Sequence, residues 1–164
     1  MAPLINQHGL VLSDPWRCVG SEDELGEICP SATQHLILSM PLWLEQGQRL
    51  AERGHSIGLW LGPQDEPEVL APALESLPVI AVHFSTFTDG RGYSQGRILH
   101  ERMGYRGDLR AIGDVLRDQI YLLYKCGFNS FELRADQSPE EAVAALNDFS
   151  WSPLVGRQTV FQAD

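Results

Sequence analysis

The chain has few cysteines and no long apolar run. Its three cysteines, Cys18, Cys29 and Cys126, form no CxxC pair and no Cys/His spacing typical of zinc or iron–sulfur ligation. Scattered thiols of this kind predict a cytoplasmic protein. No stretch of about 18 apolar residues is present, which predicts that the chain does not span a membrane. The N-terminus lacks the basic start and apolar core of a secretory signal.

Short catalytic and cofactor motifs are also missing. The glycines at 90, 92 and 96 match neither a Walker loop nor the GxGxxG dinucleotide fingerprint, and no GxSxG nucleophile elbow is present. The five histidines show no ligand spacing. We therefore expect this chain to hold no metal and no cofactor of its own.

Basic residues are scarce and unevenly placed. The 164 residues carry a net charge of −10, which argues against binding to nucleic acid or to an anionic membrane, because both need a basic surface. Residues 84–134 hold eight of the 12 basic residues against six acidic ones. All basic residues but Lys125 are Arg, which binds anions in planar, bidentate geometry, although genome composition also explains this preference. The stretch is typical of a site for an anion or a specific partner.

Apolar runs alternate with helical patterns from residue 33 onward. This alternation predicts an α/β domain over residues 31–164, with about five βα units and a mainly parallel sheet, after an N-terminal extension at residues 1–30. The repeat of about 20–24 residues suits a partial barrel, while an open doubly wound sheet is the alternative. We expect strands at 35–40, 56–61, 79–84, 109–112 and 130–133, and helices at 41–53, 65–77, 92–103, 115–126 and 138–149.

The ends of the chain give weaker signals. Residues 9–13 and 16–19 predict short strands in the extension, and residues 21–27 a loop or short helix. Asp65 is a candidate cap for its helix, and Ser138 with Glu141 predicts a capping box around Pro139. The tail, residues 151–164, has no helical period and is expected to be extended.

Ligands of parallel sheets gather at the carboxyl ends of the strands, so the loop after residue 84 is the first candidate site. A Gly-rich turn opening onto a helix, with two arginines, predicts an anion cradle. An ordinary structural role explains the same residues: the acid caps the helix, the glycines allow a tight turn, and the second arginine pairs with Glu101. The candidate anion- or partner-binding residues of this loop and helix start are Asp89, Gly90, Arg91, Gly92, Tyr93, Ser94 and Arg97.

The next candidate follows the strand at 109–112, which contains Arg110. Asp114 in cap position and Asp118 one turn later could bind Mg²⁺ or divide acid and base roles, with Arg117 nearby. Alternatively, Asp114 only caps the helix and Asp118 pairs with an arginine at 97, 102 or 110. We interpret His83, Cys126 and the tyrosines of the helix at 115–126 as core residues.

The words FTDGRGYS, GYRGDLRAIGDVLRDQ and CGF resemble a family of bacterial proteins called domain of unknown function, family number nine hundred and thirty-four. The likeness covers most of residues 33–135. Gly96 departs from it, since a helix former is expected there. The matching positions are Phe87, Thr88, Asp89, Gly90, Arg91, Gly92, Tyr93, Ser94, Arg97, Arg102, Gly104, Arg110, Gly113, Asp114, Arg117, Asp118, Gln119, Cys126, Gly127 and Phe128.

Members of this family are often labelled oxidoreductases and are typically encoded beside the haemoprotein subunit of an assimilatory sulfite reductase. The resemblance therefore implies a role in sulfate assimilation. Our first expectation is an accessory or docking protein for a sirohaem sulfite reductase, in which sirohaem and the iron–sulfur cluster belong to the partner. The alternative is an enzyme that binds an oxyanion or phosphate through the Arg/Asp cluster at 89–118. A third hypothesis is a homodimer that covers the edges of an incomplete barrel.

Overall fold

The computed structural model describes residues 2–28 and 32–150. Cys29 and the tail at residues 151–164 lie outside the described residues. One sheet contains all the strands of the described residues. They are β1 (Leu4–Asn6), β2 (Gly9–Leu10), β3 (Trp16–Val19), β4 (His35–Ser39), β5 (Ser56–Leu61), β6 (Val79–Phe84), β7 (Asp108–Gly113) and β8 (Ser130–Glu132).

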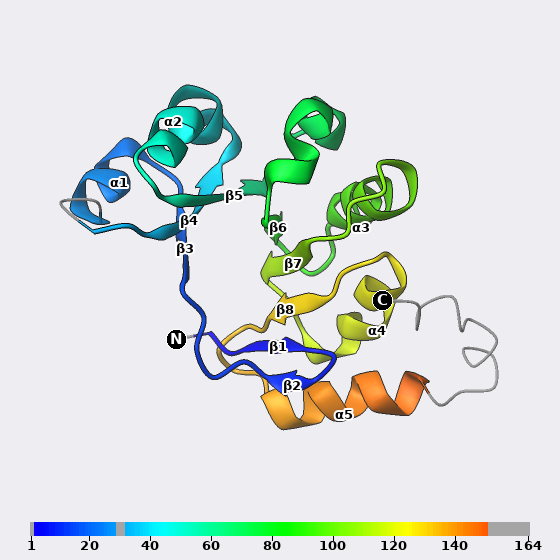
Figure 1. Ribbon diagram of the computed structural model, residues 1–164. Coiled ribbons are helices and arrows are strands. Elements are labelled where there is room, and N and C mark those ends of the chain that lie inside the picture. Colours follow the sequence, from blue (N-terminus) through cyan, green and yellow to red (C-terminus); the bar gives the residue numbers. More distant parts are fainter. Residues whose placement is uncertain (1, 29–31, 151–164) are drawn as a thin grey trace.

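The strand order is β2-β1-β8-β7-β6-β5-β4-β3. From β3 to β8, each strand pairs in parallel with the next one along the chain, while β1 is antiparallel to β8 and to β2. The sheet curls into an arc, and the helices lie along its convex side (Figure 1). The α/β class with a mainly parallel sheet is thus confirmed. A doubly wound sheet would reverse its strand order at a switch point, so the partial barrel is the correct alternative.

The helical elements follow the predicted order. They are α1 (Glu22–Ile28), α2 (Met40–Glu52), η1 (Pro67–Ser76), α3 (Arg91–Arg97), η2 (Ile98–Arg102), η3 (Arg117–Gln119), α4 (Ile120–Lys125) and α5 (Pro139–Ser150). No helix among the described residues is long and apolar enough to cross a membrane.

Two helices differ in type from the prediction. The segment after β5 is a 3₁₀ helix, η1, and contains Pro72, whose ring would clash with the carbonyl four residues earlier in an α-helix. Asp65 does not cap this helix; its Oδ2 accepts the Gly62 backbone N–H at 2.7 Å. The helix at 92–103 begins at Arg91 and changes from α to π at Ile98. Gly96 within it is required by packing, since a Cβ there would collide with the Phe128 ring.

The helix expected at 115–126 begins later than predicted. Leu116 is extended, a 3₁₀ turn follows at Arg117, and the α-helix starts at Ile120. Asp114 therefore caps no helix, and its carboxylate is engaged elsewhere. The Ser138 cap is confirmed, since its Oγ accepts the Glu141 backbone N–H at 3.3 Å.

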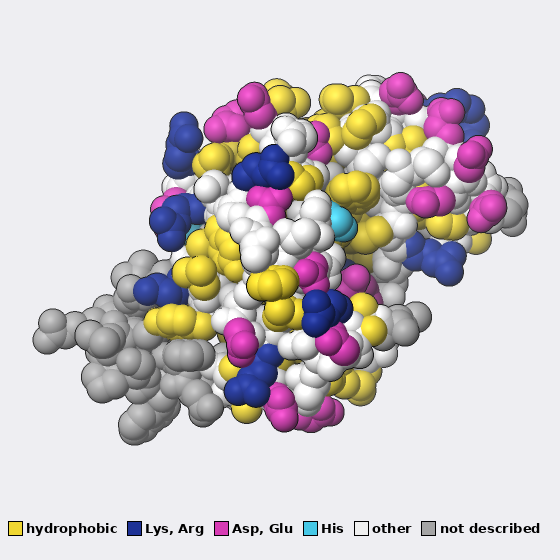
Figure 2. All heavy atoms as spheres, turned by 180° about the vertical axis from the view of Figure 1, so that it is seen from behind, with side chains coloured by type: hydrophobic (Ala, Val, Ile, Leu, Met, Phe, Trp, Pro, Cys, Tyr) yellow, Lys and Arg dark blue, Asp and Glu magenta, His cyan; other side chains and the backbone are white. Residues whose placement is uncertain are grey.

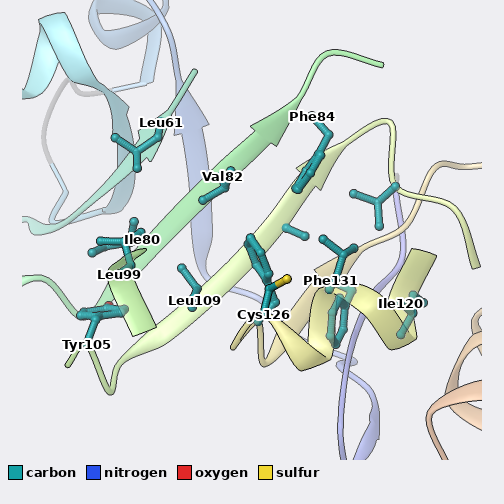
Figure 3. Packing of buried hydrophobic residues seen from close by; sticks show 14 of the residues in the cluster. Leu61, Ile80, Val82, Phe84, Leu99, Tyr105, Leu109, Ile120, Cys126 and Phe131 are labelled. Atoms are coloured by element: carbon teal, nitrogen blue, oxygen red, sulfur yellow. The ribbon is translucent and has the colours of Figure 1, made fainter. Parts of the chain in front are cut away.

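The core lies between the convex side of the sheet and the helices. Its largest cluster combines Ile80, Leu109 and Phe131 from three strands with Leu99 and Cys126 from the helical layer (Figure 3). Cys126 is buried in this cluster, as predicted. Extensive apolar burial of this kind is the main source of stability for a chain of this size.

The concave side of the arc carries a smaller cluster and a crossing segment. Ile37, Val79, Ala81 and Ile112 pack there beneath Trp16 and Trp60. After β2, the chain runs across the open side of the arc to reach β3 at the other edge of the sheet (Figure 1). The predicted strand at Trp16–Val19 is confirmed, whereas β1 was not predicted. The division of the chain at residue 30 stays a prediction.

Candidate functional site

The carboxyl ends of β6, β7 and β8 meet at one edge of the sheet. The backbone N–H of Asp114, directly after β7, donates to the Phe84 carbonyl at the end of β6, at 2.8 Å. The backbone N–H of Arg134, after β8, donates to the Val115 carbonyl at 3.0 Å. These bonds bring together the loops after β6 and β7, in which the sequence predicted a site, and the loop after β8.

The loop after β6 is held by its centre, at Phe87. The Phe87 backbone N–H donates to Asp114 Oδ2 at 2.9 Å, and its carbonyl accepts from Gln119 Nε2 at 2.6 Å. Both backbone groups of this residue are therefore fixed by side chains from beyond β7. The Phe87 ring itself is 50% exposed. A rigid backbone thus presents an aromatic ring to the solvent.

Arg134 connects the loops after β7 and β8. Its Nη1 donates to Asp114 Oδ1 at 2.9 Å, and its Nε donates to Asp136 Oδ1 at 2.6 Å. Hydrogen bonds from the Arg134 guanidinium lower the pKa of Asp136 to about 2. The same two carboxylates raise the pKa of Arg134. Arg134 and Asp136 are consequently charged at neutral pH.

Asp89 and Arg91 form a bidentate pair at the start of α3. Arg91 donates to Asp89 through Nε at 3.0 Å and Nη2 at 2.9 Å, and its backbone N–H also donates to Asp89 Oδ1 at 3.0 Å. These side-chain hydrogen bonds lower the pKa of Asp89. Asp89 was expected to cap this helix, but the N-cap residue is Gly90 and α3 has no side-chain cap hydrogen bond, so that prediction is wrong. The Arg91 guanidinium is thus bound to the Asp89 carboxylate, in place of the anion that the sequence predicted.

The two glycines of the predicted turn have different roles. A Cβ at Gly92 would lie 2.5 Å from Phe84 Cε1, so the close approach of α3 to β6 requires glycine there. Gly90 has open space around its Cα and a φ of −76°, which any residue adopts. Glycine is therefore required at residue 92 by the contact of α3 with β6, and neither glycine is required by the backbone conformation of the turn.

Tyr93, Ser94 and Arg97 line a groove between α3 and α4, together with Leu122 and Cys126. The groove has a volume of about 150 Å³. Tyr93 packs edge-on against Phe84, with ring centroids 5.3 Å apart. Burial raises the pKa of Tyr93, and the Gln119 side chain offsets part of this rise. The predicted pairing of Arg97 with Glu101 is present, although the closest N–O distance is 3.9 Å.

The other predicted charged residues do not join one cluster. Arg117 pairs with Glu141 Oε2 at 3.1 Å. Asp118 is exposed and forms no ion pair within residues 2–28 and 32–150, so its predicted pairing with an arginine is wrong. Asp114 is turned toward Phe87 and Arg134, because extended Leu116 separates it from the helix. The described part of the chain has no cluster of three or more His, Cys, Asp or Glu placed to hold a metal ion.

Arg110 lies on the concave side of the sheet, away from this edge. Only 4% of its side chain is exposed, and its guanidinium donates to Asp14 and Asp108, each at 2.8 Å. The pair with Asp14 fixes the crossing segment. His83 also faces the concave side, where its ring lies 5.5 Å from Trp60, and it is half-buried rather than a core residue. Burial lowers the pKa of His83.

Sequence reasoning singled out the loops after β6 and β7, which lie at one edge of the sheet, and missed residues that connect them. Phe87 and Gln119 were predicted only as positions that match the family, and neither was assigned a role in the site. The available signal for Phe87 was an aromatic residue between two threonines in an otherwise polar loop. Arg134 was not predicted as a site residue, since nothing local points to its pairing with Asp114, 20 residues away.

Comparison with known proteins assigns the chain to a family. No curated protein matches the sequence. Residues 58–153 match the family described as bacterial protein of unknown function (DUF934). The match covers more than half of the 164 residues, including every predicted site residue and the edge formed by β6, β7 and β8. The chain therefore belongs to the bacterial DUF934 family.

Proposed function

We propose that this protein is an accessory protein of assimilatory sulfite reduction that docks onto a sirohaem sulfite reductase. The docking site is the Phe87 surface, which we define as Phe87, Arg91, Arg117 and Arg134. The observation that carries the proposal is the fixed backbone of Phe87 beneath an exposed ring. The resemblance in FTDGRGYS and GYRGDLRAIGDVLRDQ supports the identity of the partner.

A pre-organised aromatic ring is suited to an interface hot spot. Residues that dominate binding energy are enriched in aromatics and Arg, and binding is tighter when little conformational freedom is lost. Asp114 and Gln119 hold Phe87 in place before any partner arrives. A partner pocket for this ring would therefore gain its contacts without having to order the loop.

The arginines around Phe87 suit a protein partner better than a small anion. Arg91, Arg117 and Arg134 are each paired with a carboxylate at 3.1 Å or less, and each is about half exposed. A paired guanidinium keeps its planar face available for packing, while its charge is already compensated. Paired Arg next to an aromatic ring is typical of the rim and core of protein interfaces.

The charge of the remaining surface supports association with a basic partner. Residues 20–76 contain ten Asp and Glu but only two Arg. Figure 2 shows acidic side chains gathered over the end of the molecule formed by α1 and α2. A strong field of one sign steers a partner of opposite charge toward encounter and speeds association at low salt. We expect the reductase to present a basic face.

The alternative is an enzyme that uses the Arg/Asp cluster to bind an oxyanion or a phosphate. It requires the four candidate arginines to converge on one ligand. In the structure, Arg110 lies on the concave side, and Arg91 and Arg117 are paired with separate acids. This distribution favours the docking function over a single four-arginine site.

The test is recovery of the tagged protein from its native host, grown with sulfate as sole sulfur source. Bound proteins are identified by mass spectrometry and by the absorbance of sirohaem. We expect the sulfite reductase haemoprotein to be recovered with the normal protein and lost with Phe87→Ala. Recovery of the protein without the reductase, together with unchanged reductase activity in a strain lacking this protein, would contradict the proposal. Sedimentation of the purified chain tests the homodimer hypothesis separately.

A further inference from the structure

Arg97 differs from the other arginines of the candidate site in how its charge is compensated. Arg91, Arg110, Arg117 and Arg134 each donate to a carboxylate at 3.1 Å or less. For Arg97, the closest carboxylate atom is Glu101 Oε1, 3.9 Å from Nε. Such an exposed i,i+4 pair contributes little and is readily exchanged. The Arg97 guanidinium therefore keeps most of its capacity to bind an anion.

Arg97 lies at a groove with further hydrogen-bonding groups. Its Nη2 is 3.8 Å from Cys126 Sγ, and Tyr93 and Ser94 also line the groove. Leu122, 51% exposed, forms an apolar wall. The volume of about 150 Å³ corresponds to that of about five water molecules in the liquid, which is enough for a small oxyanion.

The electrostatics of the groove favour a negative ligand. Burial raises the pKa of Tyr93, so its hydroxyl remains a neutral group that can donate a hydrogen bond. Burial also raises the pKa of Cys126, so its thiol carries no negative charge that would repel an anion. Lys125 is a second positive charge near the groove, since it acts on the pKa of the Cys126 thiol in the same direction as Arg97. An anion that binds Arg97 has to displace the Glu101 carboxylate.

We propose that the groove between α3 and α4 is a binding site for a small oxyanion. Arg97 supplies the charge-assisted hydrogen bonds, and the hydroxyls of Tyr93 and Ser94 supply neutral ones. The ligand is either a free inorganic anion or the terminal sulfonate or phosphate of a larger molecule, because the groove is open to solvent beside Leu122. This site uses other residues than the Phe87 surface and does not depend on docking.

The test is calorimetric titration of the purified full-length chain with two sets of ligands at constant ionic strength. One set is inorganic sulfite, sulfate and phosphate, and the other is an alkyl sulfonate and an alkyl phosphate. We expect saturable binding of at least one ligand, with the affinity falling about tenfold or more in Arg97→Gln. Stronger binding by the first set assigns the site to free anions, and stronger binding by the second assigns it to a terminal group.

Arg102→Gln is the matched control, since it removes the same charge from η2, where Arg102 is exposed and 3.6 Å from Glu68. Its affinity should equal that of the unmodified chain, and Arg97→Lys should bind with intermediate affinity because it retains the charge but not the planar fork. Absence of saturable binding by every ligand would overturn the inference. Equal losses in Arg97→Gln and Arg102→Gln would also overturn it, since the effect would then be one of net charge.

Discussion

Asp114 Oδ2 accepts the backbone N–H of Phe87 at 2.9 Å, although 27 residues separate them in the sequence. The same carboxylate accepts a hydrogen bond from Arg134 through its other oxygen. One acid directly after β7 thus joins the loops that follow β6 and β8. The position of the Phe87 ring depends on this connection.

Removing the Asp114 carboxylate should loosen the loop and lower stability. Asp114→Ala loses two charge-assisted hydrogen bonds from a side chain that is 21% exposed, so we expect the free energy of unfolding to fall by about 1–3 kcal/mol. Urea denaturation measures the loss, and amide hydrogen exchange should show faster exchange at Phe87. Asp118→Ala removes an equal charge without a bond and should have little effect. Equal stability of the two variants would refute this role for Asp114.

The close contact of α3 with β6 predicts a difference between neighbouring glycines. Gly92→Ala places a Cβ against the Phe84 ring and should destabilise the protein by about 1–3 kcal/mol. Gly90→Ala adds a Cβ in open space and should change the free energy of unfolding by less than about 0.5 kcal/mol. Thermal and urea unfolding of both variants check the pair. A similar loss in both would indicate that the turn, not the helix contact, requires glycine.

The strands of this fold could be predicted from the sequence more fully than its helices. Short apolar runs such as Val79–Phe84 sufficed for strands, because buried strands of a parallel sheet are apolar on both faces. Helix type and helix starts were less predictable. Asp114 has the residue type of a cap, and only tertiary contacts with Phe87 and Arg134 draw it away from that role.

The candidate site was predicted as a set of residues and not as an arrangement. The carboxyl-end rule placed the loops after β6 and β7 at one edge of the sheet, since it depends only on strand direction. The partners of the arginines could not be predicted. Arg110 finds Asp14 across 96 residues, through a crossing segment that no local pattern signals. Arg97 was grouped with the other arginines, although its environment sets it apart.

The crossing segment should depend on its bond to β7. Asp14→Asn weakens the hydrogen bonds to buried Arg110, which retains Asp108, so we expect a loss of about 1–3 kcal/mol in the free energy of unfolding. Residues 11–15 should also become more sensitive to limited proteolysis. Asp23→Asn on α1 is the control, because Asp23 is an exposed acid. Unchanged proteolysis of Asp14→Asn would show that other contacts hold the segment.

The pair of Arg134 with Asp136 predicts a specific acid dependence. The pKa of Asp136 falls from 3.8 to about 2 in the folded protein, so its contribution to stability is present above pH 3.8 and is lost as the pH falls toward 2. Carbon-detected NMR titration of the Asp136 carboxyl measures this pKa directly. In Arg134→Gln it should return toward 3.8. An Asp136 pKa that is the same with and without Arg134 would contradict the assigned cause.

The docking proposal is tested most directly by the affinity of the purified chain for the sulfite reductase haemoprotein of its own host. We expect saturable binding that weakens as salt is raised, with a loss of about tenfold or more in Phe87→Ala. Leu44→Ala is the matched control, since it removes an exposed apolar side chain from α2, and it should bind as the unmodified chain does. No binding, or equal binding by all three proteins, would contradict the proposal that the Phe87 surface is the docking site.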